Sequence, residues 1–163
     1  MTQIRDLLDG QLGRVTMYRL VTIVLAVLAA IFILFSVTGV IEGVPVKHEL
    51  MALAVLLIVS YGSNHVFALI WKIKPHSESS IITALLLFFL FVPMLFTDSA
   101  SYAWLAAAAV LANLSKYVLA WRGRHVFNPA AAGAFLVYIG QQVFGRELGT
   151  FAGWQAAATD EML

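Results

Sequence analysis

The chain has 163 residues and a formal net charge of +1, and 61% of its residues are hydrophobic while only 12% are charged. A soluble domain is about 45–50% apolar and about 25% charged, so this composition favours a protein that has lipid as its solvent. The near-neutral charge argues against nucleic-acid binding. The absence of cysteine excludes disulfides, thiolate-bound iron–sulfur clusters and thiol nucleophiles. We therefore expect one all-α membrane domain, in which any redox chemistry comes from an organic cofactor or a partner.

Residues 1–19 precede the first apolar run and predict an amphipathic segment at the cytoplasmic membrane surface. Apolar side chains recur there at helical spacing, with Arg5, Asp6 and Asp9 between them, as in helices that lie in a membrane interface. The apolar run that follows is too long for the core of a cleaved signal peptide, so we interpret it as a retained anchor. The recurring apolar positions are Ile4, Leu7, Leu8, Leu12 and Val15.

Five apolar segments follow. A helix needs about 20 mostly apolar residues to cross the hydrocarbon core of a membrane, and the first, second and fourth segments meet that length. The third and fifth are shorter, and we expect them to be tilted, re-entrant or half-helices. The segments are expected at 20–40, 51–71, 81–95, 102–120 and 129–144, inside a membrane domain of residues 20–145.

The positive charges predict the orientation, because cytoplasmic loops carry an excess of lysine and arginine. Only Lys47 and Arg146 lie on the side opposite the N-terminus. We therefore expect a multi-pass protein of a bacterial-type inner membrane, with a cytoplasmic N-terminus and an extracytoplasmic tail at 146–163 that could be truncated. An odd number of segments is typical of one repeat of an inverted-repeat transporter fold. The positive residues on the N-terminal side are Arg5, Arg14, Arg19, Lys72, Lys74, Lys116, Arg122 and Arg124.

Four polar residues lie in the middle of the second segment: Ser60, Tyr61, Asn64 and His65. Their spacing of i, i+1, i+4 and i+5 predicts one helical face, which should avoid lipid because unsatisfied polar groups are costly in hydrocarbon. The stripe either forms hydrogen bonds between helices or lines a cofactor site or an ion path. The histidines of the chain show no metal-ligand spacing, so no metal site is expected.

The third segment begins with a second polar group, formed by Glu78, Ser79, Ser80 and Thr83. Hydroxyls and a carboxylate at the start of a helix can cap its free N–H groups and suit its positive dipole end. The same N–H groups can instead hold a phosphate or another anion, with the hydroxyls as extra donors. Both interpretations stay open on the sequence alone.

A third polar group lies around the last two segments. Asn128 followed by Pro129 is typical of a helix start, and small residues up to Gly133 allow a backbone or a planar ligand to come close. Asn113 and Lys116 lie one turn apart on the preceding segment. We expect these groups to focus positive potential on one cytoplasmic region, although Lys116 could instead extend to the membrane interface. No glycine-rich phosphate loop, metalloprotease motif or nucleophile elbow is present, so no catalytic residue is assigned.

Three stretches of the sequence together resemble one family of membrane proteins. Their order and spacing are similar to those of the family of membrane subunits shared by the sodium-pumping NADH:quinone oxidoreductase and the Rnf electron-transport complex. The resemblance covers about residues 50–144 and is nearest to relatives joined to a flavin reductase module. The stretches are His76-x-Glu78-Ser79-x-x-Ile82-Thr83-Ala84-Leu85-Leu86, Ser115-Lys116-Tyr117 and His125-Val126-Phe127-Asn128-Pro129-Ala130-Ala131.

The resemblance implies a half-length membrane subunit of a redox-linked electron-transport and ion-coupling complex, whose family fold holds flavin between two inverted five-helix repeats. An NADH- or ferredoxin-linked reductase module would supply electrons, and the subunit would not be catalytic alone. The expected partners are the lipid bilayer, that reductase, and a second repeat or a second copy of the chain. The family's Ser-Gly-Ala-Thr-type motif for covalent FMN is absent from the sequence, so the expected cofactor is non-covalent riboflavin or FMN, without haem.

The candidate cofactor-binding residues follow from the polar groups and the resemblance together. The alternative function is half of a non-redox transporter or channel, in which the same short helices form a substrate site near the bilayer midplane. The candidates are Glu78, Ser79, Ser80, Thr83, Asn113, Lys116, Phe127, Asn128, Pro129 and Gly133.

Overall fold

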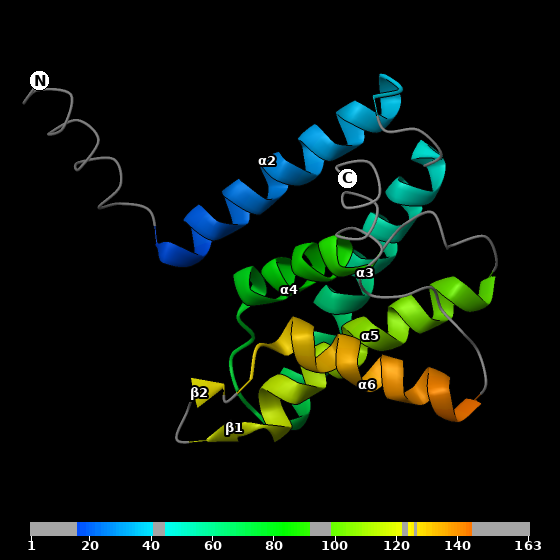
Figure 1. The fold of residues 1–163 in the computed structure, drawn as a ribbon. Helices are drawn as coiled ribbons and strands as arrows, with labels where there is room; N and C mark the ends of the chain where they lie inside the picture. Colours follow the sequence, from blue (N-terminus) through cyan, green and yellow to red (C-terminus); the bar gives the residue numbers. More distant parts are fainter. Residues whose placement is uncertain (1–15, 41–44, 92–98, 122–123, 126, 145–163) are drawn as a thin grey trace, which may run out of the picture.

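The computed structural model describes residues 16–40, 45–91, 99–121, 124–125 and 127–144. This part of the chain contains five helices and one short hairpin, so the expected all-α fold is confirmed (Figure 1). The helices alternate in direction, and α2, α4 and α6 all begin on the left of Figure 1. The elements are α2 (Met17–Val37), α3 (Val46–Ile70), α4 (Ser77–Leu90), α5 (Ser99–Val118), β1 (Ala120–Trp121), β2 (Arg124–His125) and α6 (Pro129–Phe144).

Four helices begin a few residues before the apolar runs that predicted them, and α6 has the predicted bounds. The added residues are mostly polar, such as Lys47 to Glu49 at the start of α3 and Ser77 to Ser80 at the start of α4. Polar residues suit a first helical turn, where backbone N–H groups have no partner inside the helix. Hydropathy therefore located the apolar part of each helix and missed its polar start. The short third and fifth segments are confirmed as helices of 14 and 16 residues.

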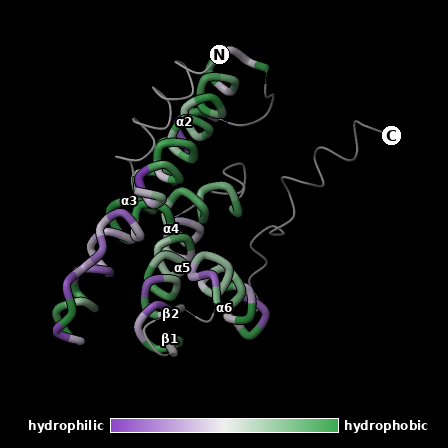
Figure 2. Tube along the Cα trace, turned by 90° about the vertical axis from the view of Figure 1, so that its left-hand side faces the viewer, coloured by the Kyte–Doolittle hydropathy of each residue, from purple (hydrophilic) through white to green (hydrophobic). Residues whose placement is uncertain are grey.

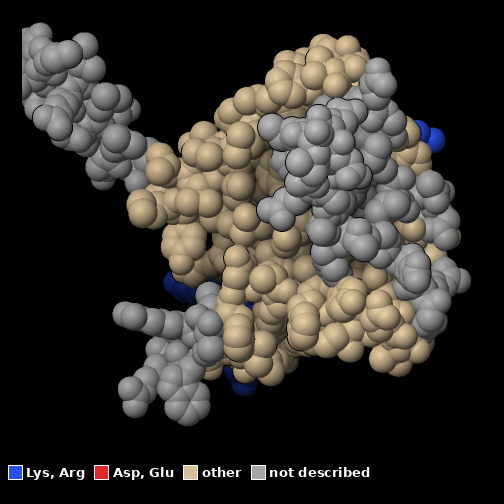
Figure 3. All heavy atoms as spheres, in the orientation of Figure 1, with Lys and Arg blue, Asp and Glu red and all other residues tan. Residues whose placement is uncertain are grey.

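Two helices, α2 and α3, are long and apolar enough to cross a membrane. Hydrophobic colour runs along nearly all of α2 (Figure 2). Large apolar side chains of α2 are exposed, including Ile23 at 57% and Leu34 at 56%. On the face drawn in Figure 3, described Lys and Arg atoms appear at the lower left and at the upper right, and the described surface beside them is mostly uncharged.

The interior of the molecule is built around α4 and α5. Helix α4 contacts α2, α3, α5 and α6, whereas α5 packs mainly between α3 and α6. Small residues let these helices approach closely, because Ala108, Ala109 and Ala112 on α5 are fully buried. Gly133 on α6 faces this surface, where an added Cβ would come within 2.5 Å of the Ala108 carbonyl oxygen. Small residues serve the same purpose between helices in membranes.

Two strands of two residues each form a short hairpin between α5 and α6. Strand β1 pairs with β2 in antiparallel register, with Ala120 opposite His125 and Trp121 opposite Arg124. The predicted amphipathic segment at 1–19 lies outside the described residues except for its last four positions, and the tail at 146–163 lies outside them entirely.

Substituting Gly133 by alanine should destabilise the protein, because the new methyl group would meet backbone atoms of α5 that cannot move aside. We expect a loss of about 1–3 kcal/mol, measured as a lower thermal unfolding temperature in lipid nanodiscs. Gly62→Ala is the matched control, since nothing lies within 4 Å of its added Cβ. Equal unfolding temperatures for the two variants would contradict the close contact of α5 with α6.

Candidate functional site

A buried side chain on α5, Asn113, joins three helices through its amide group. Its Nδ2 atom lies 3.1 Å from the Ser60 carbonyl oxygen and 2.9 Å from the Ser60 Oγ atom on α3. The Ser60 hydroxyl in turn donates to the Ser80 carbonyl oxygen of α4 at 2.8 Å. All three residues are 0% exposed. Since buried polar groups are costly when unpaired, this network requires α3, α4 and α5 to stay together.

Lys116 lies one turn further along α5 and points into the protein. Its Nζ atom donates to Asn113 Oδ1 at 2.9 Å and to the Ser79 carbonyl oxygen at 3.1 Å. The residue is 6% exposed, so the interpretation that it extends to the membrane interface is wrong. Among the described residues, no carboxylate lies within 4.0 Å of it. A buried ammonium group without a counter-ion favours an anion nearby.

A second set of hydrogen bonds lies beside Lys116 at the ends of α3 and α5. The Tyr117 hydroxyl is 3.0 Å from Asn64 Oδ1, and the Asn64 amide donates to the His76 carbonyl oxygen at 3.4 Å. The ring of Tyr117 also contacts Trp71, with centroids 5.5 Å apart, and Phe67, at 5.9 Å. Aromatic surface and a buried cation therefore lie together at this end of the molecule.

Several of these groups, among them Asn64, Lys116 and Tyr117, border a pocket of about 320 Å³. This volume is at the small end of the range for ligand sites, about 300–1,000 Å³. Three groups in its wall carry or can carry positive charge, Lys74, His76 and Lys116, and the wall includes no Asp or Glu among the described residues. The arrangement suits an anionic or electron-rich planar ligand. The full lining is Asn64, Ile73, Lys74, His76, Ser79, Lys116, Tyr117 and Ala120.

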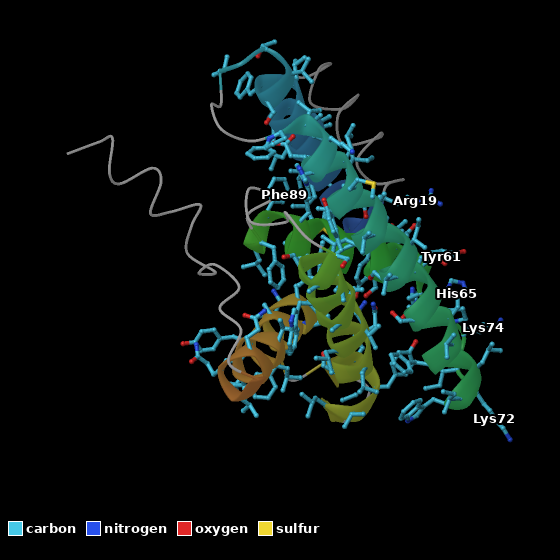
Figure 4. All side chains as sticks on the ribbon, turned by 90° about the vertical axis from the view of Figure 1, so that its right-hand side faces the viewer. Arg19, Tyr61, His65, Lys72, Lys74 and Phe89 are labelled. Atoms are coloured by element: carbon cyan, nitrogen blue, oxygen red, sulfur yellow. The ribbon has the colours of Figure 1, made fainter. Side chains whose placement is uncertain are left out.

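The predicted polar stripe of α3 divides between two faces. Ser60 and Asn64 are 0% and 3% exposed, whereas Tyr61 is 47% exposed. Tyr61 and His65 lie on the outer side of α3 in Figure 4, with ring centroids 4.2 Å apart. Successive helical residues are about 100° apart around the axis, so the i and i+1 positions fall on different faces. Ser60 and Asn64 form hydrogen bonds between helices, which was one of the two alternatives for the stripe. Asn64 also lines the pocket.

The hydroxyl groups at the start of α4 do not cap that helix. Its N-cap is His76, which makes no capping bond with its side chain. The Ser80 hydroxyl donates to the Ser77 carbonyl oxygen, and Thr83 donates to the Ser79 carbonyl oxygen. Both hydroxyls are thus occupied within α4, and of the predicted polar group only Ser79 reaches the pocket.

Glu78 lies outside the pocket, although it was a candidate cofactor residue. Its Oε1 atom accepts a hydrogen bond from Arg19 Nε at 3.0 Å, in an ion pair whose side chains are 65% and 37% exposed for Arg19 and Glu78. Exposed pairs of this kind contribute little to stability. The pair connects the start of α2 to the start of α4 beside the pocket wall.

The third polar group starts α6 as predicted, but it does not reach the pocket. Asn128 Oδ1 accepts from the backbone N–H of Ala130 at 3.0 Å, and α6 begins at Pro129. Phe127 is 62% exposed, and Gly133 is used in packing against α5. The starts of α4 and α6 lie on the same side of the molecule (Figure 1), yet the described pocket wall includes no residue of α6.

Apart from Asn64, which was predicted only as part of the polar stripe, five pocket residues were not among the sequence-derived candidates: Ile73, Lys74, His76, Tyr117 and Ala120. His76 and Tyr117 belong to stretches that carried the family resemblance, and Tyr117 directly follows Lys116. Lys74 was interpreted only as an orientation signal. Its position just before a helix start could have indicated a role in the site. A lysine there adds its positive charge to that of the N-terminal end of the helix dipole.

Comparisons with family models, curated proteins and solved structures give no match for this chain. Its function is therefore inferred from its own residues and geometry.

Replacing Asn113 by leucine should destabilise the protein, because Lys116 and Ser60 both lose a buried partner. The expected cost is about 1–3 kcal/mol, measured by thermal unfolding in nanodiscs. Gln142→Leu is the matched control, since Gln142 is an exposed amide. If the two variants unfolded at the same temperature, the network would not hold α3, α4 and α5 together.

Proposed function

We propose that this chain is a multi-pass membrane subunit of a redox-linked electron-transport and ion-coupling complex. In this proposal, the pocket at the ends of α3, α4 and α5 binds a non-covalent flavin. The chain forms half of a larger core, which a second repeat or a second copy completes. A soluble reductase with bound flavin or NADH supplies electrons on the cytoplasmic side.

One contact carries the proposal, the hydrogen bond from Lys116 Nζ to the Ser79 carbonyl oxygen at 3.1 Å. Two of the three stretches that resemble the redox family meet at this contact, although they are 37 positions apart in the sequence. His76, Ser79, Lys116 and Tyr117, all from these two stretches, border the same pocket. A shared ligand site explains why the two stretches converge there.

The chemistry of the pocket fits a flavin ring system. Tyr117 offers an aromatic surface, and Lys116, Lys74 and His76 offer positive charge or hydrogen-bond donors. Two N–H bonds of the Lys116 ammonium group are used by Ser79 and Asn113, and an ammonium group has three. The third is available to the ligand. A bound flavin would supply one- and two-electron transfer, and Lys116 would stabilise negative charge on its reduced ring.

Membrane insertion with a cytoplasmic N-terminus fits the same arrangement. Lys72, Lys74 and Lys116 lie at the ends of α3 and α5, on the side where α2, α4 and α6 begin. Lysine and arginine favour the cytoplasmic side, so the pocket would open toward a soluble electron donor. The short helix α4 is in contact with all four of the other helices, as expected for a helix that does not fully span the bilayer.

The purified protein should carry close to one flavin per chain, seen in its visible absorption spectrum. Lys116→Met should lower flavin affinity about tenfold or more, because the buried charge and its donor are lost. Lys47→Met, at the opposite end of the molecule, is the matched control and should retain the flavin.

Protein that stays colourless after reconstitution with riboflavin or FMN would contradict the flavin proposal. Solute uptake into proteoliposomes that is unaffected by flavin depletion would instead favour the non-redox transporter.

The orientation can be tested with single cysteines, because the natural chain has none. Lys47→Cys and Lys74→Cys both place the thiol at exposed positions. A membrane-impermeant maleimide should label position 47 in spheroplasts and label position 74 only after permeabilisation. The reverse pattern would contradict the cytoplasmic N-terminus.

A further inference from the structure

A buried carboxyl group lies at the end of the molecule opposite the pocket. Glu49 is in the first turn of α3 and is 0% exposed. Its Oε1 atom accepts a hydrogen bond from the hydroxyl of Ser36, which lies in the last turn of α2 and is 8% exposed. The second apolar segment was expected to begin at residue 51, and the earlier start of α3 at Val46 brings Glu49 into the helix.

The second oxygen of this carboxyl group makes no hydrogen bond in the part of the chain that the structure describes. Glu49 Oε2 is buried and has no hydrogen-bond partner among the described residues. An ionised carboxylate that is removed from water without a cationic partner is strongly disfavoured, and such groups take up a proton instead. The neutral acid, with one hydrogen bond from Ser36, is the form that this environment accepts.

The helix dipoles do not overcome this cost. The N-terminal end of α3 favours a negative charge at Glu49, while the C-terminal end of α2 beside Ser36 opposes one. These two contributions act in opposite directions, and each is smaller than the cost of burying an unpaired carboxylate.

Within the described part of the chain, the charged and titratable groups at this end do not neutralise Glu49. Those on the described elements are Lys47 and His48 on α3 and Tyr102 on α5, while the last turns of α2, α4 and α6 contribute none. Lys47 is exposed, and no ion pair with Glu49 exists within the described residues. His48 Nδ1 is paired with the Tyr102 hydroxyl at 3.0 Å.

A proton suits this site better than a metal ion. One carboxyl group and one hydroxyl offer few of the six to eight oxygens that a hard cation such as calcium takes. The described residues also contain no group of three His, Asp or Glu side chains that could hold a metal. A proton needs only the carboxyl group itself.

We propose that Glu49 is a proton-binding site, neutral at physiological pH and coupled to the contact between α2 and α3. Loss of the proton would leave a bare carboxylate between the two helices, so deprotonation should weaken their contact. The inference does not depend on the flavin proposal, because Glu49 and the pocket lie at opposite ends of α3. Eleven helical positions separate Glu49 from Ser60, about 17 Å along the axis, and the buried residues between them are Ala52 and Leu56.

Infrared spectroscopy of the full chain in nanodiscs tests the site directly. At neutral pH the wild-type protein should show a protonated-carboxyl stretching band that shifts in deuterated water. Glu49→Gln should remove that band, whereas the matched variant Glu78→Gln should keep it. A spectrum in which Glu49→Gln removes no such band would overturn the proposal.

Stability against pH gives an independent readout. A proton held by the folded state and released on unfolding stabilises the protein at low pH, and this stabilisation is lost as the pH rises. The unfolding temperature of the wild type should therefore fall in alkaline solution more than that of Glu49→Gln, which stays neutral and keeps an acceptor for Ser36. Parallel pH profiles would count against the proposal. A stabilisation by sodium over choline that Glu49→Gln abolishes would overturn it in favour of a metal cation.

Discussion

The architecture depends on keeping the buried amide of Asn113 satisfied. Its Nδ2 atom contacts α3 at Ser60, and its Oδ1 atom accepts from Lys116, which in turn reaches α4 at Ser79. These polar groups thereby hold three helices in one register. In lipid, where apolar surfaces alone give no preference for one helix over another, such bonds and small-residue contacts decide which helices pair. The same network holds Lys116 inside, where it lines the pocket.

Polar chemistry is concentrated at the two ends of one buried face of α3. The amide and hydroxyl of Asn64 and Ser60 lie toward the pocket, and the carboxyl group of Glu49 lies at the other end, with Ala52 and Leu56 between them. The described side chains of this face therefore form no continuous proton path. In the proposed complex, a proton at Glu49 would act through the contact between α2 and α3 at Ser36 and Glu49.

The sequence predicted the helices well because apolar runs of this length have few alternatives. It also predicted that Lys116 and Asn113 lie together, since residues at i and i+3 share a helical face. It could not show that Lys116 turns inward, because that depends on Ser79, far away in the chain. It failed for Glu49, because a polar first turn lowers local hydropathy and the helix was expected to begin after it. The sequence also could not show that Ser60 is buried while Tyr61 is exposed, because their environments depend on where α5 packs.

A structure of the protein in nanodiscs with added FMN tests the central claim most directly. The account predicts ligand density in the pocket between α3, α4 and α5, with a polar ligand atom within hydrogen-bond distance of Lys116 Nζ and with Tyr117 against the ring system. Density at another site, or a pocket that stays empty at saturating FMN while Lys116 turns to the surface, would contradict it.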